Sequence, residues 1–191
     1  MDTTDFQHRL TNNNTPTLIM GILNVTPDSF SDGGQFLDTK SAVCHALKMA
    51  EQGAEIIDIG GESTRPGSDP VSINDELTRV IPVIEGIRGE SAIPISIDTY
   101  KSIVARAALA AGADIINDIS GLNFDPDMVN IVRDHRVPIV IMHIKGTPKN
   151  MQVDPQYDDL MQEVIDYFQK QIDFCRENGV PKSKIILDPG I

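Results

Sequence analysis

The sequence has no apolar run long enough to cross a membrane, and it is poor in cysteine and in basic residues. Its apolar stretches all fall well short of the ~20 residues that a transmembrane helix needs. Segment 1–16 is polar and rich in Asn and Thr, with no apolar core. It is therefore not a secretory signal, and we expect a flexible N-terminal tail and no membrane partner.

Cysteine occurs only twice, at Cys44 and Cys175, and both lie in segments with a helical pattern far apart in the sequence. Two such residues favour reduced thiols in a cytoplasmic protein over a disulfide framework.

Basic residues are outnumbered, with 16 Lys and Arg against 28 Asp and Glu and a formal net charge of −12. Nucleic-acid binding depends on basic patches, so we expect no nucleic-acid partner. The same charge repels anionic small substrates. Binding one would require local cations or a metal ion.

Several short apolar runs each end at a polar residue. The runs are 18–23, which ends at Asn24; 93–97, at Asp98; 115–116, at Asn117; and 185–187, at Asp188. Runs this short, rich in Ile and alternating with helix-like stretches, indicate buried parallel strands. Parallel strands share one carboxyl-terminal edge, so these side chains are expected to gather where parallel α/β folds bind ligands.

The pattern predicts strands and helices in strict alternation. Strands are expected at 17–24, 55–60, 94–98, 114–117, 137–142 and 184–188, and helices at 39–53, 72–88, 100–111, 126–135 and 157–178. Asp38 is a candidate N-cap for the first helix, and Gly179 a candidate C-cap for the last. The repeated units predict a (β/α)₈ TIM barrel. A doubly wound open sheet is the alternative, but no glycine-rich dinucleotide fingerprint follows the first strand.

The barrel domain is expected to span 17–191 and to be incomplete. A full barrel has eight strands and ~250 residues. Here six strands are predicted, and the sequence stops directly after the sixth. The first and sixth strands would then be unpaired edges. We expect this polypeptide alone to fold poorly and to be catalytically inactive.

Two loops that follow the first two strands carry further polar chemistry. Residues 24–34 read NVTPDSFSDGG, in which glycines and small hydroxyl side chains surround Phe30. That composition suits a lid that closes over a ligand. Residues 60–67 read GGESTRPG, where glycines let backbone N–H groups approach an anion and Arg65 supplies a cation.

These two loops resemble the signature loops of the dihydropteroate synthases. Shorter matches are SIDT at 96–99, INDISG at 116–121, MHIKGTP at 142–148 with MQ at 151–152, and DPG at 188–190. The resemblance covers about 18–191. The shorter motifs are shared with other pterin-binding barrels, such as the methyltetrahydrofolate domains of corrinoid methyltransferases.

The resemblance implies a transferase of folate biosynthesis, a homodimer and a sulfonamide target. Such an enzyme condenses 6-hydroxymethyl-7,8-dihydropterin pyrophosphate with p-aminobenzoate, assisted by Mg²⁺. Asn24 is then implied as a metal or phosphate contact. Phe30, Thr64 and Pro66 resemble the p-aminobenzoate pocket, and Arg65 is implied to shape that loop or to meet anions. The lysine-serine loop and the Arg-x-His pair of the family would follow Ile191.

The strand-end residues also suit a pterin on chemical grounds. A pterin presents amino, N–H, carbonyl and ring-nitrogen groups in one plane, so its recognition needs carboxylates and an amide. Asp98, Asn117 and Asp188 are that set and the expected catalytic group, with Met142 as an apolar wall. An ionised Asp98 would favour a cationic methylene carbon, so we expect pyrophosphate to leave before p-aminobenzoate attacks.

Two other functions stay open on the sequence alone. The chain could be a non-catalytic pterin-binding module, or a folate-dependent methyl-transfer barrel. The methyl-transfer barrel should carry a cobalamin domain elsewhere and lack the Phe30 loop, which argues against it. Asp58, in the second predicted strand, is left between a site role and a structural hydrogen bond.

Overall fold

The computed structural model describes residues 9–10, 12, 16–26, 35–63, 70–147, 151 and 154–190. Its strands are β1 (Met20–Asn24), β2 (Ile56–Gly60), β3 (Ile95–Asp98), β4 (Ile115–Asp118), β5 (Ile139–Met142) and β6 (Ile185–Asp188). Its helices are α2 (Gln35–Glu51), α3 (Ile73–Glu90), α4 (Ser102–Ala111), α5 (Met128–His135), α6 (Leu160–Glu177) and the short 3₁₀ helix η2 (Lys182–Lys184). The predicted alternation is confirmed, with boundaries displaced by a few residues. None of these described helices is long and apolar enough to cross a membrane.

The helix ends differ in one respect from the prediction. Asp38 as an N-cap is wrong, because α2 begins at Gln35 and Asp38 lies inside it. Side-chain caps occur instead at Ser72, before α3, and at Asp159, before α6. Gly179 follows the end of α6 with a φ of 83°, the left-handed conformation that a helix-ending glycine supplies.

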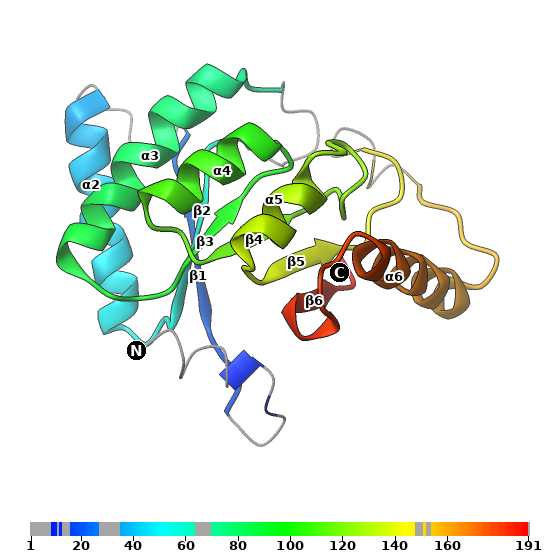
Figure 1. The fold of residues 1–191 in the computed structure, drawn as a ribbon. Coiled ribbons are helices and arrows are strands. Elements are labelled where there is room, and N and C mark those ends of the chain that lie inside the picture. The colour runs from blue at the N-terminus through cyan, green and yellow to red at the C-terminus, as the bar shows by residue number, and fades with distance from the viewer. Residues whose placement is uncertain are drawn as a thin grey trace.

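The six strands form one parallel sheet in sequence order, from β1 at one edge to β6 at the other. A helix lies between each strand and the next along the chain, with α2, α3, α4, α5 and α6 providing the five crossovers in turn. Figure 1 shows these helices gathered along one side of the sheet. Uninterrupted strand order is that of a TIM barrel, and it excludes the doubly wound alternative, whose strand order reverses.

Alternation along each strand divides the sheet into two faces. The face toward the helices carries most of the core, including Leu23, Ile57, Ile59, Ile95, Ile97, Ile116, Ile139 and Ile141. The opposite face, here called the inner face, carries a smaller cluster of Ile56, Ile115 and Val140, against which Leu10, Leu18, Met20 and Ile186 pack. Within segment 1–16, Leu10 therefore contacts the sheet, and Arg9 forms an ion pair with Glu55.

Arg88 forms hydrogen bonds and an ion pair with segments at the amino-terminal edge of the sheet. Arg88, near the end of α3, donates to the carbonyl oxygens of Gly112 at 2.7 Å and Ile93 at 2.9 Å. It also pairs with the carboxylate of Asp114 at 2.6 Å, and the same carboxylate accepts the N–H of Ile95 at 2.9 Å. These bonds join α3 to the starts of β3 and β4, at the edge opposite the strand-end polar residues.

Close packing of α2 on α3 requires a residue without a side chain. A Cβ atom placed on Gly86 of α3 would lie 2.6 Å from Cγ2 of Val43 in α2. Valine is stiff at χ1, so it cannot easily move aside. Gly89, on the same helix, has nothing within 4 Å of the corresponding position.

We therefore expect Gly86→Ala and Gly89→Ala to have different effects on the free energy of unfolding. Gly86→Ala should lower the free energy of unfolding by about 1–3 kcal/mol through overpacking against Val43. Gly89→Ala should leave it unchanged or raise it by up to ~1 kcal/mol, because Ala is the better helix former. Chemical denaturation of the complete gene product measures both; equal destabilisation by the two variants would contradict the packing argument.

Candidate functional site

Four residues form a row across the inner face at the carboxyl-terminal end of the sheet. The parallel register pairs Asn24 with Gly60, Gly60 with Asp98, and Asp98 with Asn117. Neighbouring strands lie about 4.8 Å apart, and paired residues point to the same face. The expectation that Asp98 and Asn117 share one edge and one face is therefore confirmed, with Asn24 beside them.

Gly60 leaves open space in the middle of this row. A Cβ atom on Gly60 would lie 3.3 Å from Oδ2 of Asp98 and 3.5 Å from Oδ1 of Asn24. The two oxygens therefore border the same small volume. Any side chain at position 60 would occupy it, so this glycine is a site residue that the sequence reasoning did not single out.

Asp188 and Met142 lie on the same face, further toward the carboxyl-terminal edge. The register pairs Asn117 with Val140 and Val140 with Ile186, which continues the row, and then pairs Met142 with Asp188 two residues later. Asp188, Asn117 and Asp98 therefore belong to one face of one edge, as the sequence predicted.

A turn after β6 fixes the Asp188 carboxylate. The N–H of Gly190 donates to Oδ1 of Asp188 at 2.9 Å, and the N–H of His143 donates to the Asp188 carbonyl at 2.8 Å. Gly190 has a φ of 72°, and a Cβ atom there would lie 2.4 Å from the His143 carbonyl oxygen. Only glycine fits this turn, which explains the DPG sequence at 188–190.

Asp58 holds the amide of Asn117 in place. The Nδ2 of Asn117 donates to Oδ2 of Asp58 at 3.1 Å, and Asp58 is 5% exposed. The structure thus resolves the role that the sequence left open, because this hydrogen bond is structural and also orients a predicted site residue. The available signal was a carboxylate in the middle of an otherwise apolar strand, two residues before Gly60.

Two buried polar atoms beneath the row are unsatisfied. Within the described part of the chain, neither Oδ1 of Asp58 nor Oγ of Ser96 has a hydrogen-bond partner. Ser96 pairs with Asp58 across the β2–β3 register, and it lies two residues before Asp98 on the same face of β3. Buried polar atoms are nearly always hydrogen-bonded, so this polar floor is unusual for a core and typical of a binding site.

Like charge and burial raise the proton affinity of the site carboxyls. Burial raises the pKa of Asp98 well above its ordinary range, and the nearby carboxylates of Asp58, Glu76, Asp118 and Glu62 raise it further. Burial also raises the pKa of Asp58, although the Asn117 hydrogen bond opposes the shift. A ligand that donates N–H groups to Asp98 would favour its ionised form.

The inner face offers oxygen ligands but no protein cage for a metal ion. Among the described residues, no group of three or more His, Cys, Asp and Glu side chains could hold one. Asn24 is exposed, and its Oδ1 lies close to the Asp98 carboxylate across Gly60. An amide oxygen of this kind suits a hard cation that keeps most of its waters, as Mg²⁺ does.

The predicted p-aminobenzoate residues lie outside the described part of the chain. These are Phe30 in the first loop and Thr64, Arg65 and Pro66 in the second. Their roles stay predictions. The segment between β2 and α3, residues 61–72, contains this second loop, and both ends of that segment are described.

Comparison with known proteins places this geometry in one family. A sequence profile described as "Pterin binding enzyme" matches residues 20–191. The dihydropteroate synthase of Synechocystis sp. is 53% identical over 175 residues, which cover 92% of this chain and 61% of that protein. The chain thus spans about three fifths of the length of the curated relatives it matches.

Solved structures agree with the sequence comparison. Dihydropteroate synthase from Xanthomonas albilineans with 4-aminobenzoic acid superposes with a TM-score of 0.83 at 47% identity, over 91% of this chain and 61% of that one. The Clostridium difficile enzyme, in the presence of pteroic acid, gives a TM-score of 0.84 at 49% identity, over 92% and 64%. The predicted α/β barrel architecture and the predicted family are both confirmed.

The electrostatics predict that Asp98→Asn stabilises the protein. A carboxyl whose pKa is raised on folding binds more protons folded than unfolded, so its contribution falls as pH rises above the ordinary value of 3.8. Asn, which carries no charge, should raise the unfolding midpoint by roughly 2–6 °C at pH 8. The difference from the unsubstituted protein should shrink toward pH 4.

Thermal unfolding across this pH range measures the effect, with Asp114→Asn as the matched control. Asp114 is paired with Arg88, so its substitution should lower the midpoint. A lower midpoint for Asp98→Asn at pH 8 would contradict the prediction.

Proposed function

The chain belongs to the pterin-binding enzyme family, and on that premise we propose that the protein is a dihydropteroate synthase. It would join 6-hydroxymethyl-7,8-dihydropterin pyrophosphate to p-aminobenzoate, giving 7,8-dihydropteroate and pyrophosphate in folate biosynthesis. The observation that carries the proposal is the row of Asn24, Gly60, Asp98 and Asn117 on the inner face. Relatives bound to 4-aminobenzoic acid and studied with pteroic acid support the substrate class.

The pterin would bind edge-on to the strand-end residues. Asp98 and Asp188 accept hydrogen bonds from the pterin N–H groups, and Asn117 can both accept and donate. The Asp58 hydrogen bond fixes which way the Asn117 amide faces. Met142, paired in register with Asp188, supplies an apolar wall beside the ring.

Asp98 would also favour the bond-breaking step. The C–O bond between the pterin methylene and pyrophosphate breaks, and the leaving group takes the electron pair. Positive charge then develops on the methylene and the ring, where an ionised Asp98 stabilises it. The amine of p-aminobenzoate supplies the electron pair of the new C–N bond and loses one proton.

We propose Asn24 as the protein contact for Mg²⁺ or for the phosphates. When bound, Mg²⁺ would offset the charge on the departing pyrophosphate, which the net charge of −12 otherwise repels. Oδ1 of Asn24 is the oxygen that would hold it, with substrate oxygens and water completing its ligands.

The proposal extends to the second substrate, the assembly and the location. Phe30, Thr64, Arg65 and Pro66 would contact p-aminobenzoate through the two signature loops. The same resemblance implies a homodimer. Cys44 and Cys175 are both unpaired, which is typical of a reducing compartment and supports a cytoplasmic location.

The activity is tested by incubating the complete gene product with both substrates and following dihydropteroate and pyrophosphate. We expect turnover, and a fall in kcat/KM of ~10²–10³-fold for Asp98→Asn because charge stabilisation is lost. Asp114→Asn, at the opposite edge of the sheet, should retain kcat/KM. Pterin binding by calorimetry without turnover would indicate the non-catalytic alternative, and unchanged pterin affinity in Asp98→Asn would remove Asp98 from the site.

The metal assignment predicts a specific change in Mg²⁺ dependence. Chelation should abolish turnover, and added Mg²⁺ should restore it. Asn24→Ala should raise the Mg²⁺ concentration for half-maximal rate by roughly tenfold, the order of effect expected for one lost ligand contact. An unchanged Mg²⁺ requirement in Asn24→Ala, measured at saturating substrates, would contradict the assignment.

A further inference from the structure

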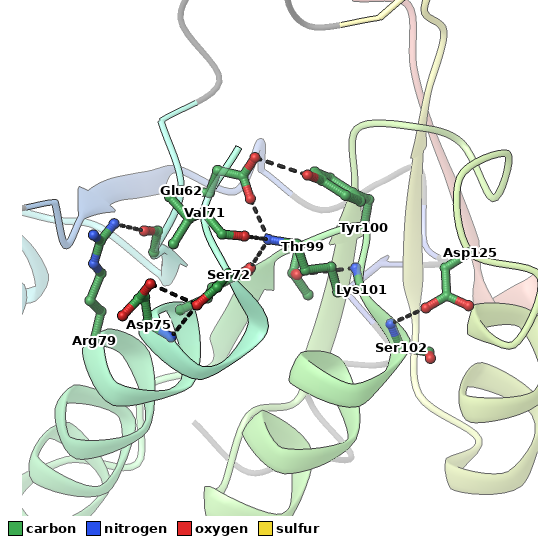
Figure 2. A network of polar contacts seen from close by, with 12 residues as sticks. Glu62, Val71, Ser72, Asp75, Arg79, Thr99, Tyr100, Lys101, Ser102 and Asp125 are labelled. Atoms are coloured by element: carbon green, nitrogen blue, oxygen red, sulfur yellow. Dashed lines mark hydrogen bonds and ion pairs between the residues drawn. The ribbon is translucent and has the colours of Figure 1, made fainter. Parts of the chain in front are cut away.

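A half-buried lysine joins the two sides of the segment between β2 and α3 that contains the second signature loop. Lys101 lies three residues after the end of β3, directly before α4, and its Nζ contacts Oε2 of Glu62, at the start of this segment. The same Nζ donates to the carbonyl oxygen of Val71, at the end of the loop, at 2.8 Å. Figure 2 shows both bonds converging on this one nitrogen. Residues 63–70 lie between the two anchored ends.

The third donor of the ammonium group is also used. Nζ contacts Oε2 of Glu76, in the first turn of α3, at 2.5 Å. An ammonium group has three donors, and all three therefore have acceptors. The Glu76 side chain is 1% exposed, and those of Lys101 and Glu62 are 13% exposed each. One buried carboxylate, Glu76, and one half-buried carboxylate, Glu62, thus share one cation.

The contacts of this cluster favour the protonated forms of Lys101 and Tyr100. Burial alone would lower the pKa of Lys101, but the hydrogen bonds and charges of Glu62 and Glu76 outweigh it and raise the pKa. Tyr100 donates its hydroxyl to Oε1 of Glu62 at 2.9 Å. Burial and that bond raise the pKa of Tyr100 to about 12, so the donor keeps its proton.

Hydrogen bonds also hold the backbone at Lys101 and at the residue after it. Its backbone N–H donates to Oγ1 of Thr99 at 3.2 Å, and the next N–H, of Ser102, donates to Oδ2 of Asp125 at 2.8 Å. The loop start is held a second time, because Arg79 of α3 donates to the Gly61 carbonyl at 2.8 Å. Figure 2 shows the contacts of Arg79, Thr99 and Asp125 as dashed lines around Lys101 and its neighbours.

We propose that Lys101 is a positioning residue for the second substrate: it holds Glu62 and Val71 together, and in the sequence these two residues flank the predicted p-aminobenzoate contacts Thr64, Arg65 and Pro66. This inference rests on the proposed function. Glu62 lies two residues after Gly60, the centre of the strand-end row, whereas Asp98 and Asn117 are held by the sheet register. Loss of the Lys101 contacts should therefore affect the KM for p-aminobenzoate more than the KM for the pterin substrate. Small displacements of positioning groups have large kinetic effects.

The test compares Lys101→Met, Lys101→Arg and Arg88→Met in the complete gene product. Lys101→Met should raise the KM for p-aminobenzoate roughly tenfold or more, with the pterin substrate KM changing less than ~2-fold. Lys101→Arg, which keeps the charge and several donors, should recover most of the loss. Arg88→Met removes a comparable set of contacts at the opposite edge, and should lower the unfolding midpoint without raising that KM.

A second readout is independent of catalysis. Hydrogen exchange of the peptide that covers 62–71 should speed up in Lys101→Met and stay unchanged in Arg88→Met. If Lys101→Met does not fold, Glu62→Gln takes its place, with smaller effects expected in the same direction on both measurements.

The outcomes separate the two proposals. A gene product that forms no dihydropteroate refutes the proposed function, and the clamp is then decided by exchange alone. Unchanged exchange at 62–71 overturns the clamp. So does an equal rise in both KM values, because a purely structural residue would act on both substrates.

Discussion

The in-register pairing of parallel strands is the constraint on which the site depends. It places Asn24, Gly60, Asp98 and Asn117 side by side on one face, although they come from four separate strands. A shift of one residue in any strand would turn its polar end toward the helices. The register is held because the alternate residues, such as Ile59, Ile97 and Ile116, are fully buried against those helices. Apolar packing on one face therefore determines the chemistry on the other.

The same arrangement places like charges close together. Asp58 and Asp98 come from neighbouring strands of the inner face, and the charge of Asp58 adds to burial in raising the pKa of Asp98. A lower-energy core would replace them with apolar side chains. Their presence at the ligand-binding edge is the pattern expected of a site whose stability is lowered in favour of function.

Much of this was predictable from the sequence, and the failures have identifiable causes. Short Ile-rich runs with polar ends predicted the strands, their order and the shared edge of Asp98, Asn117 and Asp188, because period-2 burial is a local signal. The predicted start of α2 was wrong. Asp is a residue type that favours N-caps, which suggested Asp38, but the helix begins three residues earlier, at Gln35. The hydrogen bond between Asp58 and Asn117 and the Lys101 cluster join residues 25 to 59 positions apart. Such contacts depend on tertiary geometry that periodicity does not encode.

The Arg88 contacts lie at the amino-terminal edge, joining α3 to the segments that lead into β3 and β4. The candidate site residues occupy the other edge. A sheet divided in this way can accept altered loops at its carboxyl-terminal rim while the hydrogen bonds at its amino-terminal edge persist. Selection for a new substrate, or for escape from an inhibitor, can therefore act on one rim with little penalty to folding. The Arg88 contacts stabilise the fold at the amino-terminal edge, so sequence changes at the other edge leave this contribution to stability intact.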